Sequence, residues 1–319
     1  MAFRNSVLLG TLGRYHDRFH EYQSARGLEE RLTIARDLPR VHGVEPVYPQ
    51  DLGHDGAGVA TVKAAGLAVS AVNVNVKGEA IFRHGSFTSP DAKARETAVS
   101  YLKTSMDLAD DLGAGMISVC PLIDGWDYAF EVDYQAQWRW LVEAFEAAAA
   151  HRPDIRISIE YKAYESRNRV ILPTMGRTLH LCNQIGAPNI GVTMDVGHAF
   201  IAHETPAAEA CLGHDAGRLF YVHFNDNNRA ADWDMLPASV NLWETLELLY
   251  YIEKIGWDGW FAYDVFTRNG DNAEAVAATF EIMENLQKLL HKVGMEELRG
   301  MIAQDTPART FNALIAKLL

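Results

Sequence analysis

Residues 190–198 read IGVTMDVGH, an apolar run that ends in a carboxylate, a glycine and a histidine. Both faces of such a run are apolar, as in a parallel strand that is covered on its two sides. Similar short runs recur along the chain, and a longer segment with helical periodicity follows each of them. Gly66, Gly113, Gly186 and Gly256 close four of these helical segments, as glycine does at a helix C-terminus. The apolar runs lie at residues 7–9, 43–48, 67–76, 115–122, 155–161, 190–196, 220–224 and 260–266.

Eight such strand and helix units predict an α/β protein with a single (β/α)8 TIM barrel. A doubly wound sheet has the same alternation, but it needs a Gly-rich phosphate loop after its first strand. Residues 9–13 read only LGTLG, which we interpret as a turn. The expected helices lie at residues 27–38, 54–65, 91–112, 134–150, 174–186, 204–215, 241–255 and 272–293.

The chain continues beyond the eighth helical segment. Its last residues carry apolar side chains at near-helical spacing, among them Leu298, Phe311 and Ile315. We therefore expect the barrel domain to occupy residues 1–296 and a C-terminal helical extension to occupy residues 297–319. This extension is expected to cover the bottom of the barrel or to contact a neighbouring subunit, and both alternatives stay open.

Charge and composition exclude several classes of protein. The 319 residues include 29 Lys and Arg against 42 Asp and Glu, so the net charge is −13 and a phosphate backbone would be repelled. No run reaches the roughly 18 apolar residues that span a bilayer. The three cysteines have neither CxxC spacing nor the density of a disulfide scaffold, which is typical of a reducing, cytoplasmic compartment. We expect no nucleic acid and no membrane as partner.

Polar side chains follow the last four predicted strands, at the rim where barrels of this kind carry their active sites. Because a buried carboxylate costs several kcal/mol unless it is paired or metal-bound, so many acids at one rim predict bound cations. Oxygen ligands with some imidazole suit Mg2+ or Mn2+, and we expect no thiolate, which would favour zinc. These side chains are Glu160, Lys162, Asp195, His198, His223, Asp232, Asp234 and Asp264.

The predicted ligands divide into two sets. A first ion would take one residue from each of the four strands: Glu160, Asp195, His223 and Asp264. A second ion, more exposed and facing the substrate, would take His198, Asp232 and Asp234. Asp232 and Asp234 alternate, so in an extended segment both face the same side. Two ions held in this way can clamp two neighbouring oxygens of a substrate.

Around these residues the sequence resembles the metal-dependent sugar isomerases related to L-rhamnose isomerase and xylose isomerase. The segment EYKAYE at residues 160–165 is similar to the family's Glu-x-Lys segment, and HFND at residues 223–226 with Asp232-x-Asp234 is similar to the rhamnose isomerase motif. The similarity spans residues 70–266. Further matching segments are Asp195-x-Gly197-His198, GSFTSP at residues 85–90 and DGWDY at residues 124–128.

The resemblance implies a divalent-metal-dependent aldose–ketose isomerase that moves hydrogen between C1 and C2 of an unphosphorylated sugar. Lys162 matches the family's lysine that binds or polarises the C1 oxygen, beside Asp232 and Asp234. One or two ions of Mg2+ or Mn2+ are implied, and we expect a homo-oligomer, a dimer or a tetramer.

The substrate is expected to be rhamnose, apiose or a pentose, since no Arg/Lys cluster or anion nest accompanies the site. Aromatic faces in rim loops can pack on the apolar face of such a sugar. We expect this role for Phe87, Trp126, Tyr128 and Trp233.

Three other functions fit parts of the pattern. Residues 223–229 also resemble a motif of the ketose 3-epimerases of the same superfamily, which use one metal and a Glu pair on the fifth and eighth strands. Here the eighth strand offers only Asp264, and the Asp232-x-Asp234 pair would go unused, so we favour the isomerase. The net charge of −13 weighs against the zinc-dependent apurinic endonucleases of this barrel family. A noncatalytic sugar-binding barrel would not need a complete set of ligands.

Overall fold

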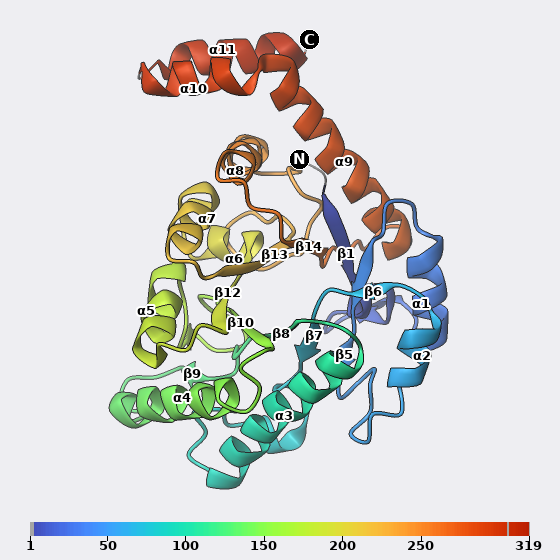
Figure 1. Ribbon diagram of the computed structural model, residues 1–319, viewed down its shortest axis with the longest axis vertical. Helices are drawn as coiled ribbons and strands as arrows, with labels where there is room; N and C mark the ends of the chain where they lie inside the picture. Colours follow the sequence, from blue (N-terminus) through green and yellow to red (C-terminus); the bar gives the residue numbers. More distant parts are fainter. Residues whose placement is uncertain (1–2, 305, 319) are drawn as a thin grey trace.

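Short parallel strands form a closed ring at the centre of the molecule, and helices surround it (Figure 1). The computed structural model describes residues 3–304 and 306–318. The strand order in the sheet is β5-β7-β8-β10-β12-β13-β14-β1-β4-β6. The strands are β1 (Arg4–Leu8), β4 (Gly43–Glu45), β5 (Val47–Tyr48), β6 (Ala68–Val69), β7 (Val72–Val74), β8 (Met116–Val119), β10 (Arg156–Glu160), β12 (Ile190–Asp195), β13 (Leu219–Phe224) and β14 (Trp260–Tyr263).

Ten segments occupy eight positions in this ring, because β4 and β5 are two halves of one strand and β6 and β7 are two halves of the next. Pro46 separates β4 from β5, and proline has no N–H to donate to a neighbouring strand. The ring closes where β1 pairs with β14 on one side and with β4 on the other. The predicted barrel is therefore confirmed, with strand ends displaced by a few residues.

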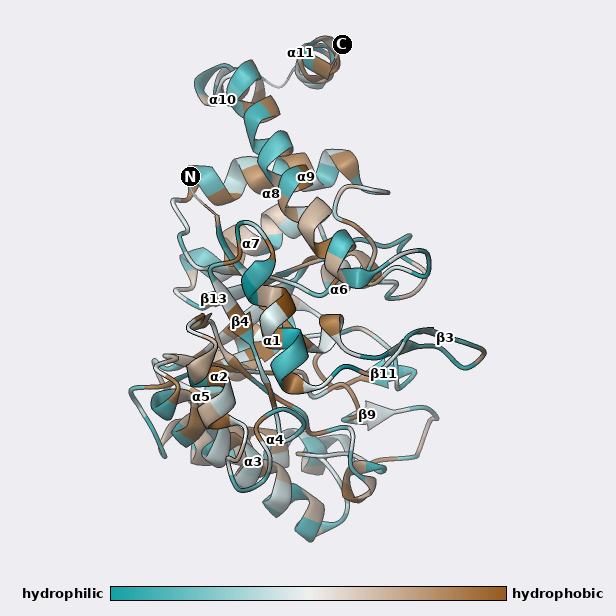
Figure 2. Cartoon of the chain, turned by 90° about the vertical axis from the view of Figure 1, so that its right-hand side faces the viewer, coloured by the Kyte–Doolittle hydropathy of each residue, from teal (hydrophilic) through white to brown (hydrophobic). Residues whose placement is uncertain are grey.

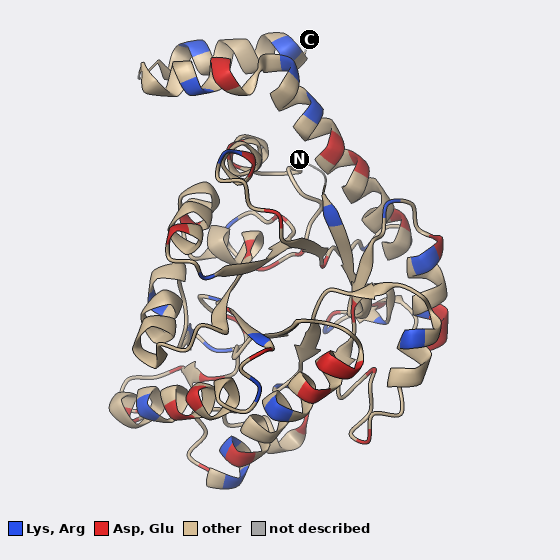
Figure 3. Cartoon of the chain, in the orientation of Figure 1, with Lys and Arg blue, Asp and Glu red and all other residues tan. Residues whose placement is uncertain are grey.

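The helices follow the strands as predicted, and several begin at a side chain that caps the first turn. Asp91, Asp133, Thr174 and Asp271 each accept a hydrogen bond from a backbone N–H of the helix that they precede. The helices are α1 (Leu28–Asp37), α2 (Val59–Ala64), α3 (Ala92–Asp111), α4 (Tyr134–Ala149), α5 (Met175–Ile185), α6 (Val196–Ile201), α7 (Pro206–Asp215), α8 (Leu242–Lys254) and α9 (Asn272–Val293). Figure 3 shows both signs of charge along α3 and α4, as expected of solvated outer faces.

One small hairpin, a second antiparallel pair and one extra helix at the rim were not predicted. The antiparallel pairs β2 (Tyr15–His16) with β3 (Glu21–Gln23), and β9 (Gly125–Trp126) with β11 (Arg169–Val170), lie in loops at the C-terminal ends of the strands. Figure 2 shows these loops projecting to one side of the barrel. The extra helix is α6, which starts directly after β12.

Two further helices, α10 (Met295–Ala303) and α11 (Pro307–Leu318), follow α9 and lie beyond the ring of strands (Figure 1). The expected domain boundary between 296 and 297 falls within α10. Phe311 of α11 packs edge-on against Trp243 of α8, with ring centroids 5.1 Å apart. Ile315 of α11 is 46% exposed, so this helix leaves apolar side chains uncovered. Among the described residues, no helix has both the length and the apolarity needed to cross a membrane.

Candidate metal centre

A cavity of about 200 Å3 lies at the C-terminal ends of the barrel strands. Its acidic and imidazole lining comes from four neighbouring strands, the fifth to the eighth around the ring, and from the loop after β13. Most of the residues predicted from the sequence meet there. The lining residues are Leu8, Asn73, Lys77, Cys120, Leu122, Glu160, Lys162, His198, His223, Asp232, Asp234 and Asp264.

The first predicted set comes together at the cavity, where Glu160, His223 and Asp264 line the wall and Asp195 lies buried beside them without being a lining residue. One ligand atom from each of Glu160, Asp195 and His223 lies within 4.8 Å of the other two, and all three residues are buried. Asp264 joins them through Asn225, whose amide donates to Asp195 Oδ2 and to Asp264 Oδ1, both at 3.0 Å. The structure thus brings together four residues that lie far apart along the chain.

Asp195 has a second task, because it is both the last residue of β12 and the N-cap of α6. Its Oδ1 accepts a hydrogen bond of 2.7 Å from the backbone N–H of His198. The strand therefore turns into a helix at the ligand itself, and the first turn of that helix carries His198 to the cavity.

The second predicted set lies next to the first. Asp232 Oδ2 is 3.0 Å from His198 Nε2 and 2.8 Å from Lys162 Nζ. Asp232 Oδ1 is buried and has no hydrogen-bond partner among the described residues. Asp232 and Asp234 both line the cavity, but the expected extended segment is wrong, because Asp234 has a left-handed φ of 47°.

Both ring nitrogens of each imidazole contact hydrogen-bond acceptors. His198 Nδ1 lies 2.9 Å from the Tyr161 carbonyl and 3.0 Å from Glu160 Oε1, and its Nε2 lies 3.0 Å from Asp232 Oδ2. Burial lowers the pKa of His198, but Asp195, Asp232 and Glu160 outweigh burial and hold it well above its usual range, so without a cation both nitrogens carry a proton. His223 Nε2 lies 3.2 Å from Glu45 Oε2, which leaves Nδ1 free toward Glu160 at 3.5 Å. Imidazoles that bind metals are commonly oriented in this way by a partner on the other nitrogen.

Glu45 was not among the predicted residues, although it is fully buried beneath His223. Its carboxylate accepts hydrogen bonds from Tyr221 Oη at 2.7 Å, from Asn73 Nδ2 at 2.9 Å and from Ser118 Oγ. A glutamate inside an otherwise apolar strand, GVEPVY at residues 43–48, is the sequence feature that could have drawn attention to it.

The site carries more acid than it can ionise by itself. Burial raises the pKa of Asp195 to about 6, with Asp232 and Glu160 adding to the effect against His198. Burial and neighbouring carboxylates also raise the pKa values of Asp234 and Asp264 well above the usual range. For Glu160, burial is outweighed by the nearby His223 and His198, which lower its pKa to about 2.

Bound positive charge would relieve this repulsion, because each divalent cation offsets two carboxylates. The unpartnered Asp232 Oδ1 and the oxygen- and imidazole-rich donor set both fit such an ion. The cluster of buried Glu, Asp and His side chains is thus consistent with a divalent metal site.

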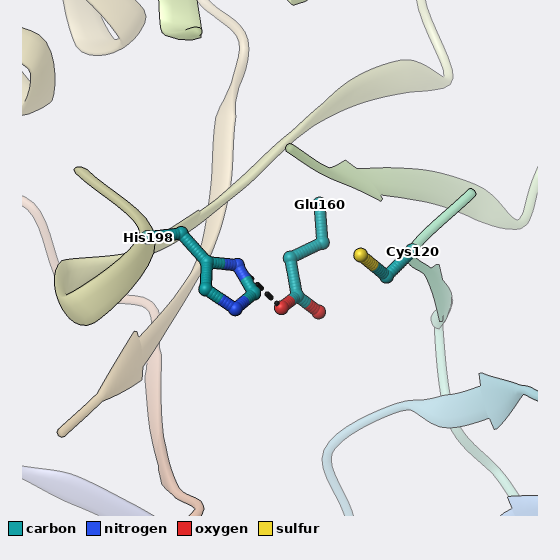
Figure 4. Close-up of side chains that lie close together, drawn as sticks. All are labelled: Cys120, Glu160 and His198. Atoms are coloured by element: carbon teal, nitrogen blue, oxygen red, sulfur yellow. Dashed lines mark ion pairs between the residues drawn. The ribbon is translucent and has the colours of Figure 1, made fainter. Parts of the chain in front are cut away.

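A thiol also lies at the site, contrary to the expectation that none would. Cys120 follows β8, and its Sγ lies within 4.8 Å of a carboxylate oxygen of Glu160 and a ring nitrogen of His198. Figure 4 shows the thiol and the imidazole on either side of the Glu160 carboxylate. Burial and the Glu160 charge raise the pKa of Cys120 to about 12.

The four aromatic residues expected to bind substrate do not line this cavity. Phe87 lies in the expected loop between β7 and α3, but it is fully buried and packs on Phe145 with ring centroids 5.0 Å apart, so its ring does not face the cavity. Trp126 packs against Tyr134 with ring centroids 4.8 Å apart. Tyr128 is 76% exposed. Trp233, between the two aspartates, is 41% exposed and donates from Nε1 to Asn228.

Comparison with known proteins places the chain in a family. The model of the family described as xylose isomerase-like TIM barrel matches residues 35–286. The chain belongs to this family. Two curated relatives are also named xylose isomerase, and neither match supports a specific relation to rhamnose isomerases.

Two curated relatives from Thermus are named xylose isomerase. The protein from Thermus thermophilus is 28% identical over 219 residues, which are 67% of this chain and 57% of the relative. The protein from Thermus caldophilus is 26% identical over 257 residues, which are 76% of this chain and 66% of the relative. The chain therefore spans less than two thirds of the length of either relative.

Among solved structures, the D-allulose 3-epimerase from Methylomonas sp. in complex with D-allulose has a TM-score of 0.70 at 15% identity, covering 89% of this chain and 97% of the other. The 3-keto-D-glucoside 4-epimerase from E. coli has a TM-score of 0.66 at 15% identity, covering 89% and 99%. At these identities the likeness shows a shared fold.

Proposed function

We propose that the protein is a divalent-metal-dependent isomerase or epimerase that moves hydrogen on an unphosphorylated monosaccharide. The observation that carries this proposal is the cavity in which four carboxylates, two imidazoles and the Lys162 ammonium converge at the C-terminal ends of the strands. Among the described residues that line the cavity, Lys77 and Lys162 are the lysines and none is an arginine. The cavity therefore lacks the arginine cluster that typically binds a phosphate group.

Two groups of residues would hold the cations. The first group comprises Glu160, Asp195, His223 and Asp264, and the second comprises His198, Asp232 and Asp234. Mg2+ or Mn2+ bound there would polarise substrate oxygens and stabilise the negative charge that develops on them. We propose one or two such ions for each chain.

Lys162 would orient the sugar. Burial lowers its pKa, but the Asp232 carboxylate at 2.8 Å outweighs burial and holds the pKa well above the usual range, so the amine stays protonated. An ammonium has three N–H donors. Lys162 can therefore keep its bond to Asp232 and still donate to a sugar oxygen in the cavity.

At the finer level we propose aldose–ketose isomerisation between C1 and C2. The group formed by His198, Asp232 and Lys162 favours this reaction, because it adds polar contacts beside the first set where a second substrate oxygen can bind. The curated relatives are named xylose isomerase, which agrees with this choice.

Ketose 3-epimerisation is the second candidate, and the solved structures favour it, since several of them are ketose 3-epimerases. Glu160 and Asp264 line the cavity from different strands. Such a pair can take a proton from one face of a sugar carbon and return it on the other.

Product analysis tests the proposal and separates the two candidates. The Mn2+-loaded protein is incubated with rhamnose, apiose, xylose, lyxose and common ketoses, and the products are identified by NMR. An aldose and ketose pair supports the isomerase, whereas a C3 epimer without any aldose supports the epimerase. Asp232→Asn should abolish turnover while the fold remains intact by circular dichroism. No conversion of any sugar in this panel would refute the proposed function.

A further inference from the structure

Cys120 forms part of the cavity wall but has no task in the proposed reaction. It is 7% exposed and lies between β8 and the rim loop that follows. Its Sγ, one oxygen of Glu160 and one ring nitrogen of His198 lie within 4.8 Å of one another (Figure 4). These three atoms offer one sulfur, one oxygen and one nitrogen ligand around the same point.

A thiolate changes which cation such a group selects. Mg2+ and Mn2+ prefer oxygen ligands, whereas sulfur and imidazole ligands together favour zinc and its softer neighbour cadmium. Ligands of a tetrahedral zinc ion with ordinary bond lengths lie about 3.5 Å apart. Side-chain shifts of about one ångström would bring the three atoms to that spacing.

A second observation, on the neighbour of His198, indicates that a ligand belongs in this cavity. The side chain of Asp232 is only 8% exposed, lines the same cavity and contacts His198 Nε2 at 3.0 Å through Oδ2. Its Oδ1 has no hydrogen-bond partner among the described residues. A buried carboxylate oxygen without a partner is costly unless a cation or a donor approaches it.

We propose that Cys120, Glu160 and His198 form a binding site for one thiophilic divalent cation, Zn2+ or Cd2+, which excludes the Mg2+ or Mn2+ of the proposed reaction. Binding breaks the S–H bond of Cys120 and one N–H bond of the His198 ring, forms bonds from the sulfur and the ring nitrogen to the cation, and releases both protons to solvent. Glu160 belongs to the first proposed set and His198 to the second. A cation held between them therefore takes one ligand from each set, and inhibition follows. The inhibition rests on the proposed function, whereas binding of the cation does not.

Cadmium titration of the full-length, chelator-treated protein tests the site directly. Bonding of a thiolate to Cd2+ gives a charge-transfer band in the ultraviolet, which reports the sulfur ligand without any sugar. We expect the wild type to develop this band and saturate at one Cd2+ per chain, and we expect excess Mn2+ to weaken the apparent affinity. Cys120→Ser should not develop it. Cys211→Ser is the matched control, because Cys211 on α7 is a partly exposed cysteine that could otherwise bind Cd2+, and this variant should keep the band.

Any of three results would overturn the proposed site: the wild type does not develop the charge-transfer band, Cys120→Ser still develops it, or Cys211→Ser loses it. If Cys120→Ser fails to fold by circular dichroism, Cys120→Ala replaces it under the same criteria.

Inhibition is measured separately on protein loaded with Mn2+. Added Zn2+ should inhibit the wild type at much lower concentration than it inhibits Cys120→Ser, each compared with its own uninhibited rate. Equal inhibition of both proteins would overturn the exclusion of the working metal. A protein that converts no sugar but shows the cadmium band would refute the proposed function and leave the thiophilic site intact.

Discussion

Replacing Glu45 by glutamine should weaken metal binding, although Glu45 is not itself one of the proposed ligands. The carboxylate shares its two oxygens among four donors, with Asn73 and Ser118 on Oε1 and Tyr221 and His223 on Oε2. A glutamine side chain keeps the shape and removes the charge. Its best orientation turns the NH2 group toward Asn73 and Ser118, whose amide and hydroxyl can rotate to accept, and leaves a neutral oxygen for His223.

The magnitude follows from the bond that changes character. A hydrogen bond to a charged group contributes about 1.5–3 kcal/mol and a neutral one about 0.5–1.5 kcal/mol. The Glu45→Gln substitution therefore weakens the hydrogen bond that orients His223 by about 1.3 kcal/mol, the difference between the midpoints of these ranges. If this free energy is lost from metal binding, the dissociation constant rises by a factor of nearly ten. Partners of metal-binding histidines typically change metal affinity by about 10–100-fold. We expect the Kd for Mn2+ to rise about tenfold.

Calorimetric titration of Mn2+ into the apoprotein measures this change, and nitrogen NMR of the imidazoles reports whether His223 keeps its proton on Nε2. Asp124→Asn is the matched control. Asp124 is also a fully buried carboxylate, but it accepts hydrogen bonds from Ser86 and Thr88 in a neighbouring loop. This variant should lose stability and retain its Mn2+ affinity. Equal changes of Kd in the two variants, or an unchanged Kd in Glu45→Gln, would refute the orienting role of Glu45.

Three further predictions concern metal removal, pH dependence and oligomeric state. A cation at about 100 times its Kd stabilises a fold by about 2.7 kcal/mol, so removal of the cation with EDTA should lower the Tm of the wild type by several degrees. EDTA should lower the Tm of Glu160→Gln by much less, and equal Tm shifts in the two proteins would contradict the assignment of Glu160. Burial and Glu209 raise the pKa of Glu204 from 4.5 to about 7, so the folded state holds its proton more tightly and the free energy of unfolding falls as pH rises between these values. The free energy of unfolding of Glu204→Gln should therefore exceed that of the wild type by about 1–2 kcal/mol at pH 8 and by little at pH 4, after allowance for partial exposure. Equal urea midpoints of the two proteins at pH 8 would disprove this. Light scattering should find a dimer or tetramer that Ile315→Glu dissociates, and a monomeric wild type would exclude the subunit contact at α11.

The strands could be predicted because their pattern is local. Residues 190–194 are largely apolar on both faces, which is typical of a strand covered on both sides, and the short length of the run favours a strand over a helix. Helix α6 could not be predicted in the same way, because Asp195 ends the strand and caps the helix with a single side chain. Nothing in the sequence marks where the strand ends and the helix begins, because Asp195 is both the last residue of the strand and the N-cap of the helix.

The ligands at strand ends could be predicted from topology, whereas their partners depend on register and closure. Val119 pairs with Ile159, which places Cys120 beside Glu160, and no local pattern encodes that register. Glu45 meets His223 across the interior of the closed barrel, although 178 residues separate them along the chain. Phe87 lies in the loop where a substrate contact was expected, but its ring packs against Phe145 and is buried, which the loop motif does not reveal.

The double role of Asp195 links events that would otherwise be independent. One of its oxygens accepts a hydrogen bond from the backbone N–H of His198, and the other accepts from Asn225, which also donates to Asp264 of the first set. A cation that draws Asp195 toward itself also pulls on the helical turn that carries His198. Loading of the first position would therefore reshape the second before anything binds there, and a two-ion titration should depart from the curve of two separate sites.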